Sequence, residues 1–187
     1  MKVPEILNVL LVLSINLVAT FIYLFFLSDE NRKKVFFSLP MLLQKAFVAF
    51  FVGPLFISPF MPQSRFPMLP EAVNMTLSLL LVFIGIAFIL GAFFKIGPVP
   101  SLKAKTNLVT QGVYGIVRHP IYAGTILTFL GLILLKNALV SLFYFPVSIG
   151  LYFLMTIFEE RSLINEYGQE YKDYQLDVRK RIIPFVI

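Results

Sequence analysis

Five long apolar stretches dominate the sequence and restrict what this chain can fold into. They cover residues 6–27, 39–61, 72–94, 120–135 and 138–158. A helix needs about 20 apolar residues to cross the roughly 30 Å hydrocarbon core of a bilayer, and only the fourth stretch falls short of that length. Backbone polar groups inside a bilayer must pair within the protein, so each stretch should be a helix. The sequence therefore predicts an all-α, polytopic membrane protein with five transmembrane helices in a single integral membrane domain, residues 1–187.

The composition supports this class and excludes several others. Of the 187 residues, 58% are hydrophobic and 14% are charged, whereas a soluble domain has about 45–50% apolar and about 25% charged residues. The chain has no cysteine and a single histidine, His119. Disulfides, zinc–cysteine sites, thiol nucleophiles and multi-histidine metal centres are thereby excluded, and we expect no metal site.

The distribution of basic residues predicts the orientation in the membrane. If the N-terminus lies outside, the outer segments contain only Lys2, Arg65 and Lys136, and the rest of the 16 Lys and Arg residues lie in or beside the three inner segments. Cytoplasmic loops of membrane proteins carry such an excess. We therefore expect the C-terminus, the connector at residues 95–119 and the tail at residues 159–187 on the cytoplasmic side. The net charge of +6 then follows from topology, and no nucleic-acid partner is expected.

The most informative segment is residues 107–124, NLVTQGVYGIVRHPIYAG. Pro120 suits the first turn of a helix, where its missing N–H group is not needed. His119 then lies at the N-cap edge of the fourth span, and Arg118 lies just outside it. Because a helix N-terminus carries partial positive charge and unpaired N–H groups, this position predicts a binding site for a carboxylate or a phosphate.

Two acidic residues, Glu159 and Glu160, directly follow the fifth apolar stretch. Acids at the end of a membrane helix are costly unless they are solvated or paired. Only Lys136 and Asn137 separate the fourth and fifth stretches, so these helices should form an antiparallel hairpin that returns His119 and Glu159 to the same face. A site with Arg, His, aromatic rings and two carboxylates suits a ligand that carries a cation, an anion and a flat ring.

Simpler explanations remain open for each of these residues. Arg118 and His119 would also serve as anchors for lipid headgroups, and Tyr114 and Tyr122 would also serve as interfacial belt residues. An ion pair between Arg118 and Glu160 would have a purely structural role, in which it holds the two helices of the hairpin together.

The tail carries a second periodic pattern. Apolar and aromatic residues recur there at three- and four-residue steps, which predicts an amphipathic helix on the membrane surface or over the site; they are Leu163, Tyr167, Tyr171, Tyr174 and Val178. Gly168 is a weak point in this helix. Residues 179–181 are all basic and are expected to meet anionic headgroups.

The two motifs together resemble a known family. The segment LVTQGVYGIVRHPIYAG, followed after one helical hairpin by EERSLINEYGQEYKDY and a proline near the end, is similar to the isoprenylcysteine carboxyl methyltransferase and phospholipid methyltransferase superfamily. The resemblance covers about residues 107–184; the first three spans match only as generic hydrophobic helices. Members bind S-adenosylmethionine in a cytosol-facing pocket between membrane helices and methylate a lipophilic acceptor that enters from the bilayer. The resemblance implies the same activity here, with residues 95–187 as the cofactor-binding half and no obligatory protein partner.

The resemblance also implies roles for single residues. Glu159 would meet the methionine ammonium, Glu160 would support it or Arg118, and His119 or Glu160 would be the base for an amine acceptor. The implied catalytic residues are Arg118, His119 and Glu160. The implied cofactor-binding residues are Thr106, Asn107, Leu108, Val109, Tyr114, His119, Pro120, Ile121, Tyr122 and Glu159.

One residue departs from the family pattern. In the prenylcysteine enzymes an arginine four residues before the ammonium-binding glutamate is thought to hold the substrate carboxylate, and here that position is Met155. Prenylcysteine, a phospholipid amine, an isoprenoid and a small thiol are therefore all admissible acceptors.

Two competing interpretations remain. Membrane sterol and steroid reductases, which bind NADPH, carry a similar RHPxYxG segment and an Ile-Pro tail, echoed here by residues 181–184. A non-enzymatic transporter or scaffold is the other alternative, but transporters usually place ionisable groups at mid-membrane, whereas the charged residue inside a span here is Lys45, near an end.

Overall fold

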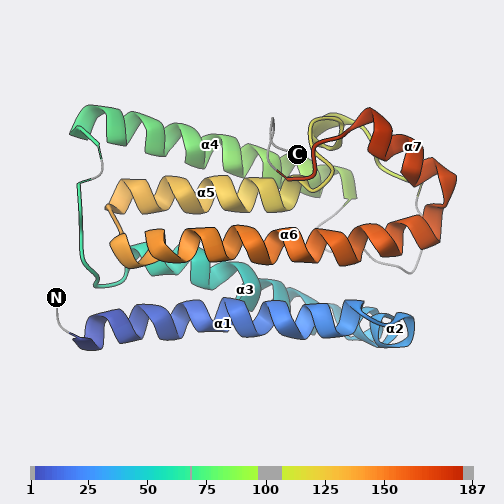
Figure 1. Ribbon diagram of the computed structural model, residues 1–187, viewed down its shortest axis with the longest axis horizontal. Coiled ribbons are helices and arrows are strands. Elements are labelled where there is room, and N and C mark those ends of the chain that lie inside the picture. Colours follow the sequence, from blue (N-terminus) through green and yellow to red (C-terminus); the bar gives the residue numbers. More distant parts are fainter. Residues whose placement is uncertain (1–2, 68, 97–106, 183–187) are drawn as a thin grey trace.

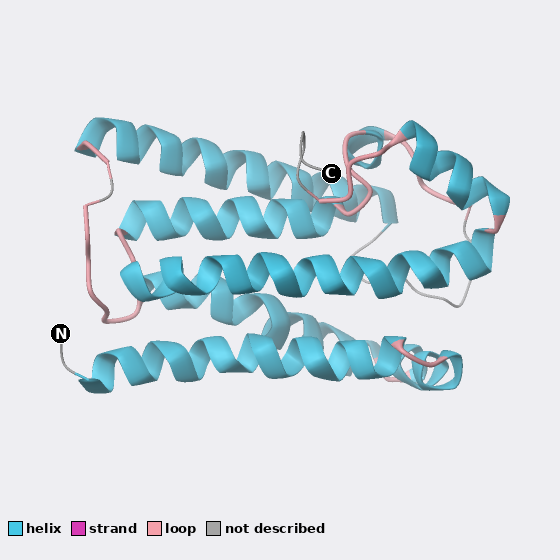
Figure 2. Cartoon of the chain, in the orientation of Figure 1, coloured by secondary structure: helices cyan, strands magenta, loops and turns pink. Residues whose placement is uncertain are grey.

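The computed structural model describes residues 3–67, 69–96 and 107–182, and every regular element in them is helical (Figure 2). The α-helices are α1 (Val3–Leu27), α2 (Glu30–Ser38), α3 (Met41–Ile57), α4 (Glu71–Ile96), α5 (Pro120–Lys136), α6 (Leu139–Tyr167) and α7 (Gln169–Asp177). Two short 3₁₀ turns, Ser58–Phe60 and Gly112–Gly115, complete the described secondary structure. The expected all-α class is confirmed.

The long helices run side by side along one axis (Figure 1). α1 and α4 form opposite edges in this view, α5 and α6 lie between them, and α2 and α7 lie at the same end of the bundle. We call this end, where α1 and α6 finish and α5 starts, the charged end. Every residue with an implied catalytic or binding role that the structure describes lies on α5, on α6 or in the connector before α5.

Four described helices are long and apolar enough to cross a membrane, namely Val3–Leu27, Leu42–Phe60, Glu71–Lys95 and Leu139–Tyr167. The fifth apolar helix, α5, has 17 residues and rises about 25 Å, less than a bilayer core. More than half of its residues are buried, because α4, α6 and α3 pack around it. A helix enclosed by protein is not required to match the thickness of the lipid.

The interface between α4 and α5 is the most extensive helix contact in the described chain, and it depends on glycine. An ideal Cβ atom placed on Gly124 would lie 2.5 Å from the backbone oxygen of Gly85, and one placed on Gly85 would lie 2.6 Å from that of Gly124. Small residues allow membrane helices to approach this closely. The pair therefore fixes the depth of α5, which carries His119 at its start.

One boundary and one helix differ from the expectations. The fifth apolar stretch ends at residue 158, but α6 continues through both acids to Tyr167. The chain then turns at Gly168, whose φ of +60° favours glycine. A helix not anticipated, α2, starts at Asp29, whose side chain accepts hydrogen bonds from the N–H groups of Asn31 and Arg32.

The opposite end of the bundle is closed by a loop after α3. Arg65 Nη1 donates to the backbone oxygens of Pro59 (2.8 Å) and Lys136 (2.7 Å), and Arg65 forms an isolated antiparallel bridge with Ala138. These contacts join the α5–α6 turn to the end of α3. Since α5 and α6 run antiparallel on either side of this turn, the start of α5 and the end of α6 both lie at the charged end (Figure 1).

The Gly85–Gly124 contact predicts a large difference between two glycine substitutions. We expect Gly124→Ala to lower the free energy of unfolding by about 1–3 kcal/mol, because the added methyl group overpacks the α4–α5 interface. Gly150→Ala on α6 is the matched control, since a Cβ there meets nothing within 4 Å. Thermal unfolding of the purified protein in detergent measures both. Equal midpoints for the two variants would contradict the interface described here.

Candidate active site

The site begins with the turn that precedes α5. His119 is the N-cap residue of α5 (φ −121°, ψ 68°) and Pro120 occupies the first turn of the helix, so the N–H groups of Arg118 and His119 lie before the helix and take no part in its own hydrogen bonds. The tail supplies their acceptors: Arg118 N donates to Lys180 O and His119 N donates to Arg181 O, both at 2.9 Å. The tail after α7 is thereby folded back onto the start of α5.

Glu160 is the centre of an ionic cluster. One carboxylate oxygen accepts from Arg118 Nε at 2.8 Å, and the other contacts Arg181 Nη2 at 2.9 Å and Gln175 Nε2 at 3.0 Å. The Glu160 side chain is 3% exposed. A carboxylate buried this deeply is tolerated only when it is paired and hydrogen-bonded, and here the connector before α5, the helix α7 and the tail each contribute a donor.

Arg118 links the cluster to the backbone of the tail. Its Nη1 atom donates to the backbone oxygens of Val178 (2.7 Å) and Arg179 (2.9 Å) while its Nε atom holds Glu160. The rigid guanidinium fork suits this divided bonding. Arg118 therefore fastens the tail and Glu160 at the same time.

Glu159, the preceding residue, has a different environment. Its Oε1 atom accepts hydrogen bonds from the hydroxyls of Tyr122 and Tyr23, and its Oε2 atom lies 3.3 Å from His119 Nδ1. Its side chain is 20% exposed, and its described partners include no arginine or lysine. Of the two acids, Glu159 is the more exposed and has no arginine or lysine among its described partners, so it is the candidate for contact with a cationic ligand group.

His119 bridges the two acids. Its Nδ1 atom faces Glu159 and its Nε2 atom faces Glu160 Oε1, each at 3.3 Å. A neutral imidazole donates only one N–H, whereas an imidazolium donates two. Burial alone would lower the pKa of His119, but its hydrogen bonds to Glu159 and Glu160 outweigh burial and raise the pKa above its usual value of 6.5. The arrangement therefore favours a positively charged His119.

Aromatic side chains form the remaining walls. The His119 ring stacks on Tyr122, with centroids 5.7 Å apart and planes 3° apart. On the other side, Tyr174 of α7 donates to the backbone oxygen of Tyr114 at 2.7 Å, and Leu108 packs against the cluster of Tyr171, Tyr174 and Val178. The apolar face of α7 thus covers the connector.

The structure brings together the residues that the sequence singled out from the two motifs. Arg118, His119, Tyr122, Glu159 and Glu160 form one contact network. Pro120 is buried, Tyr114, Leu108, Val109 and Ile121 are half-buried, and Asn107 is exposed. Thr106 lies outside the described residues.

Three residues of the network were not anticipated. Arg181 was expected at lipid headgroups, but it contacts Glu160, and Gln175 of α7 does the same. Tyr23 reaches Glu159 from α1, a helix that showed only a generic apolar pattern. The basic run at residues 179–181 was the available signal for Arg181, since a buried acid requires a cation. No pattern in the sequence singled out Tyr23 or Gln175.

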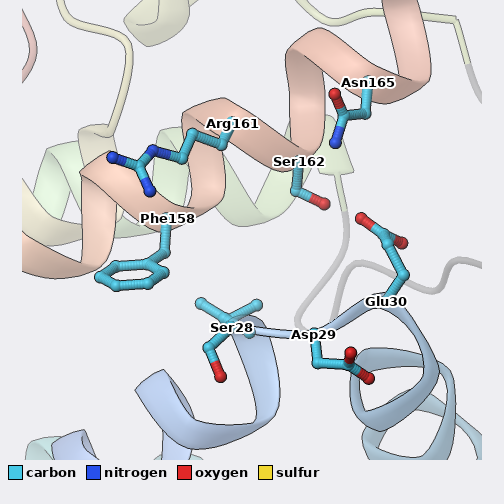
Figure 3. Close-up of a pocket in the computed structure, with 8 residues that line it drawn as sticks. Ser28, Asp29, Glu30, Phe158, Arg161, Ser162 and Asn165 are labelled. Carbon is cyan, nitrogen blue, oxygen red and sulfur yellow. The ribbon is translucent and has the colours of Figure 1, made fainter.

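A cavity of about 200 Å³ opens beside this network, between the α1–α2 junction and α6 (Figure 3). Ser28, Asp29 and Glu30 form one side. The α6 side consists of Phe158, Arg161, Ser162 and Asn165, with Arg161 lying over the Phe158 ring. Glu159 lies between Phe158 and Ser162 in the sequence but is not one of the residues that line this cavity.

The fold and the site together define a class. Apolar helices of membrane-spanning length place the chain among multi-pass membrane proteins, and its ionisable residues gather at helix ends. The family model of phospholipid methyltransferases matches residues 73–170, which is more than half of the chain, and the protein belongs to this family. The matched segment contains most of α4, all of α5 and α6, the first motif, and the second motif as far as Glu170. A search of curated proteins finds no match.

The bridged His119 predicts a distinctive titration. Because the chain has one histidine, NMR of protein labelled at histidine reports a single ring, and we expect its pKa above 6.5. A pKa that is raised in the folded state contributes stability that is fully present below the pKa of the unfolded state. This contribution is lost as the pH rises through the pKa of the folded state. The thermal midpoint should therefore fall as the pH rises above about 6.5, and His119→Gln should remove that part of the fall. A measured pKa at or below 6.5 would contradict the bridge.

Proposed function

We propose that the protein transfers a methyl group from S-adenosylmethionine to a lipophilic acceptor in the membrane. The observation that carries this proposal is the division between the two acids: Glu160 is saturated by Arg118, Arg181 and Gln175, whereas Glu159 keeps an accessible carboxylate. A zwitterionic ligand with an ammonium group fits such a site. Membership of the phospholipid methyltransferase family supports methyl transfer.

The residues around Glu159 fit S-adenosylmethionine in chemistry as well as in charge. The start of α5, where a helix N-terminus carries partial positive charge, suits the ligand carboxylate. The Tyr171 hydroxyl is buried and has no hydrogen-bond partner among the described residues, which leaves a donor for a ligand or for the connector. Following the family pattern, we assign the adenosine to residues 106–109 and Tyr114, and the methionine part to residues 119–122 and Glu159.

The roles of the three implied catalytic residues follow from their contacts. S-adenosylmethionine, when bound, supplies a methyl group on a sulfonium that needs no further activation. A charged His119 donates hydrogen bonds to both acids and is a poor base, and the lone pairs of Glu160 are occupied. We therefore propose that Arg118, His119 and Glu160 orient the ligand and exclude water rather than remove a proton from the acceptor. An amine acceptor would then lose its proton to solvent before it attacks the methyl group, and the sulfur would leave as the neutral thioether of S-adenosylhomocysteine.

The acceptor class follows from Met155. This residue is buried in the core and packs among apolar side chains, so the position gives a substrate carboxylate no cationic partner. Family membership and this absence both favour a phospholipid amine over a prenylcysteine carboxylate. An NADPH-dependent reductase is less well supported, because Arg118 and Arg181, the cations nearest the site, are already paired with Glu160.

We also propose that α5 is a fifth span and that the charged end faces the cytoplasm, as the distribution of basic residues indicates. The apolar face of α7 packs inward on Leu108, which supports a cover over the site, while Leu176 is 69% exposed and is available for contact with the membrane surface.

The proposal predicts methyl transfer that depends on Glu159. Wild-type protein with labelled S-adenosylmethionine and a total lipid extract should label a lipid, and Glu159→Ala and His119→Ala should reduce the rate by about 100-fold or more, as loss of a charged contact does. Glu166→Ala is the matched control, since Glu166 is an exposed acid on the same helix, and its rate should equal that of wild type.

Separate assays with an aminophospholipid and with a prenylcysteine identify the acceptor class, and we expect activity with the first. Labelling that is unchanged in both Glu159→Ala and His119→Ala would refute the site. Binding of NADPH in place of S-adenosylhomocysteine would refute methyl transfer.

The orientation has its own test. The natural chain has no cysteine, so single cysteines at Glu71 and Lys172, both exposed, report one position each. In intact cells a membrane-impermeant thiol reagent should label Glu71→Cys and should label Lys172→Cys only after permeabilisation. The reverse pattern would overturn the proposed orientation.

A further inference from the structure

We propose that Tyr23, on α1, is a positioning residue of the cofactor site that fixes the Glu159 carboxylate for the ligand ammonium. This inference rests on the proposed function. It makes α1 part of the site, although the family match begins at residue 73 and α1 lies wholly before it.

The geometry of Glu159 gives Tyr23 this role. The Tyr23 hydroxyl donates to Glu159 Oε1 at 3.0 Å, and Tyr122 donates to the same oxygen from α5. Two phenols from different helices therefore hold Oε1 in place. Oε2 is left facing His119 and any bound cation, so the carboxylate presents one oxygen to the ligand in a fixed direction.

The Tyr23 ring is itself held in place by neighbouring aromatic rings. Its centroid lies 5.6 Å from that of Phe36 on α2 and 5.8 Å from that of Phe47 on α3. Packing in such a group requires only a ring, which phenylalanine supplies at both neighbouring positions. The hydroxyl adds nothing to this packing, and a hydroxyl in an apolar wall is costly without a partner. Its contribution is the hydrogen bond to Glu159.

The chain supplies a matched control for this bond. Tyr144 on α6 donates to Asn16 Oδ1 on α1 at 2.9 Å, so both tyrosines connect α1 with α6 through one hydroxyl. Only Tyr23 reaches the site. If Tyr23 matters merely because it joins the two helices, Tyr23→Phe and Tyr144→Phe should have the same effects.

The test measures the affinities of the full-length protein in lipid nanodiscs for two probes. S-adenosylhomocysteine carries the ammonium group, and 5′-methylthioadenosine lacks the amino-acid part. We expect Tyr23→Phe to weaken S-adenosylhomocysteine about tenfold, as the loss of a hydrogen bond to a charged group does, and to leave 5′-methylthioadenosine unchanged. Tyr144→Phe should change neither affinity. In a Glu159→Gln background, Tyr23→Phe should cause no further loss, because the two residues act through one contact.

The possible failures are distinguishable. If wild type does not bind S-adenosylhomocysteine, the proposed function itself fails. If wild type binds it and Tyr23→Phe binds it equally well, the role of Tyr23 is refuted while the function stands. Equal losses in Tyr23→Phe and Tyr144→Phe, or equal losses for the two probes, would show that Tyr23 acts through helix packing and would also refute the inference.

Discussion

The architecture of the charged end depends on neutralising the buried carboxylate of Glu160, which lies toward the end of α6. Glu160 is 3% exposed, and a carboxylate in that position is tolerated only with close cations and donors. Arg118 before α5, Gln175 on α7 and Arg181 in the tail meet this need. Because these donors come from separate segments, satisfying one charge also folds the tail back, seats α7 over the connector and fixes the start of α5.

The adjacent acid uses the framework that Glu160 organises. Successive residues of a helix point in different directions, so Glu159 faces Tyr23 and Tyr122 while Glu160 faces the arginines. His119 contacts both acids and so links the buried carboxylate of Glu160 to the partly exposed carboxylate of Glu159. One pair of adjacent residues thereby separates stability from ligand recognition, and the polar network combines side chains of α1, α5, α6 and α7 with those of the connector and the tail.

Much of this arrangement could be predicted from the sequence, and the reasons for success and failure are physical. The lengths of the apolar stretches predicted the long helices. Pro120 and the two-residue turn between α5 and α6 predicted that His119 and Glu159 lie close together. The contact between Glu160 and Arg181 could not be predicted, because it depends on how the tail folds back onto the start of α5. Tyr23 was missed for a similar reason: a tyrosine on an apolar helix acquires its role only from the tertiary contact.

The central claim is that the two acids have different tasks, and a structure of the protein determined with S-adenosylhomocysteine bound tests it most directly. The account predicts the ligand ammonium within hydrogen-bond distance of Glu159, with Glu160 still held by Arg118 and Arg181. An ammonium bound to Glu160, with its arginines displaced, or a ligand bound away from both carboxylates, would contradict it.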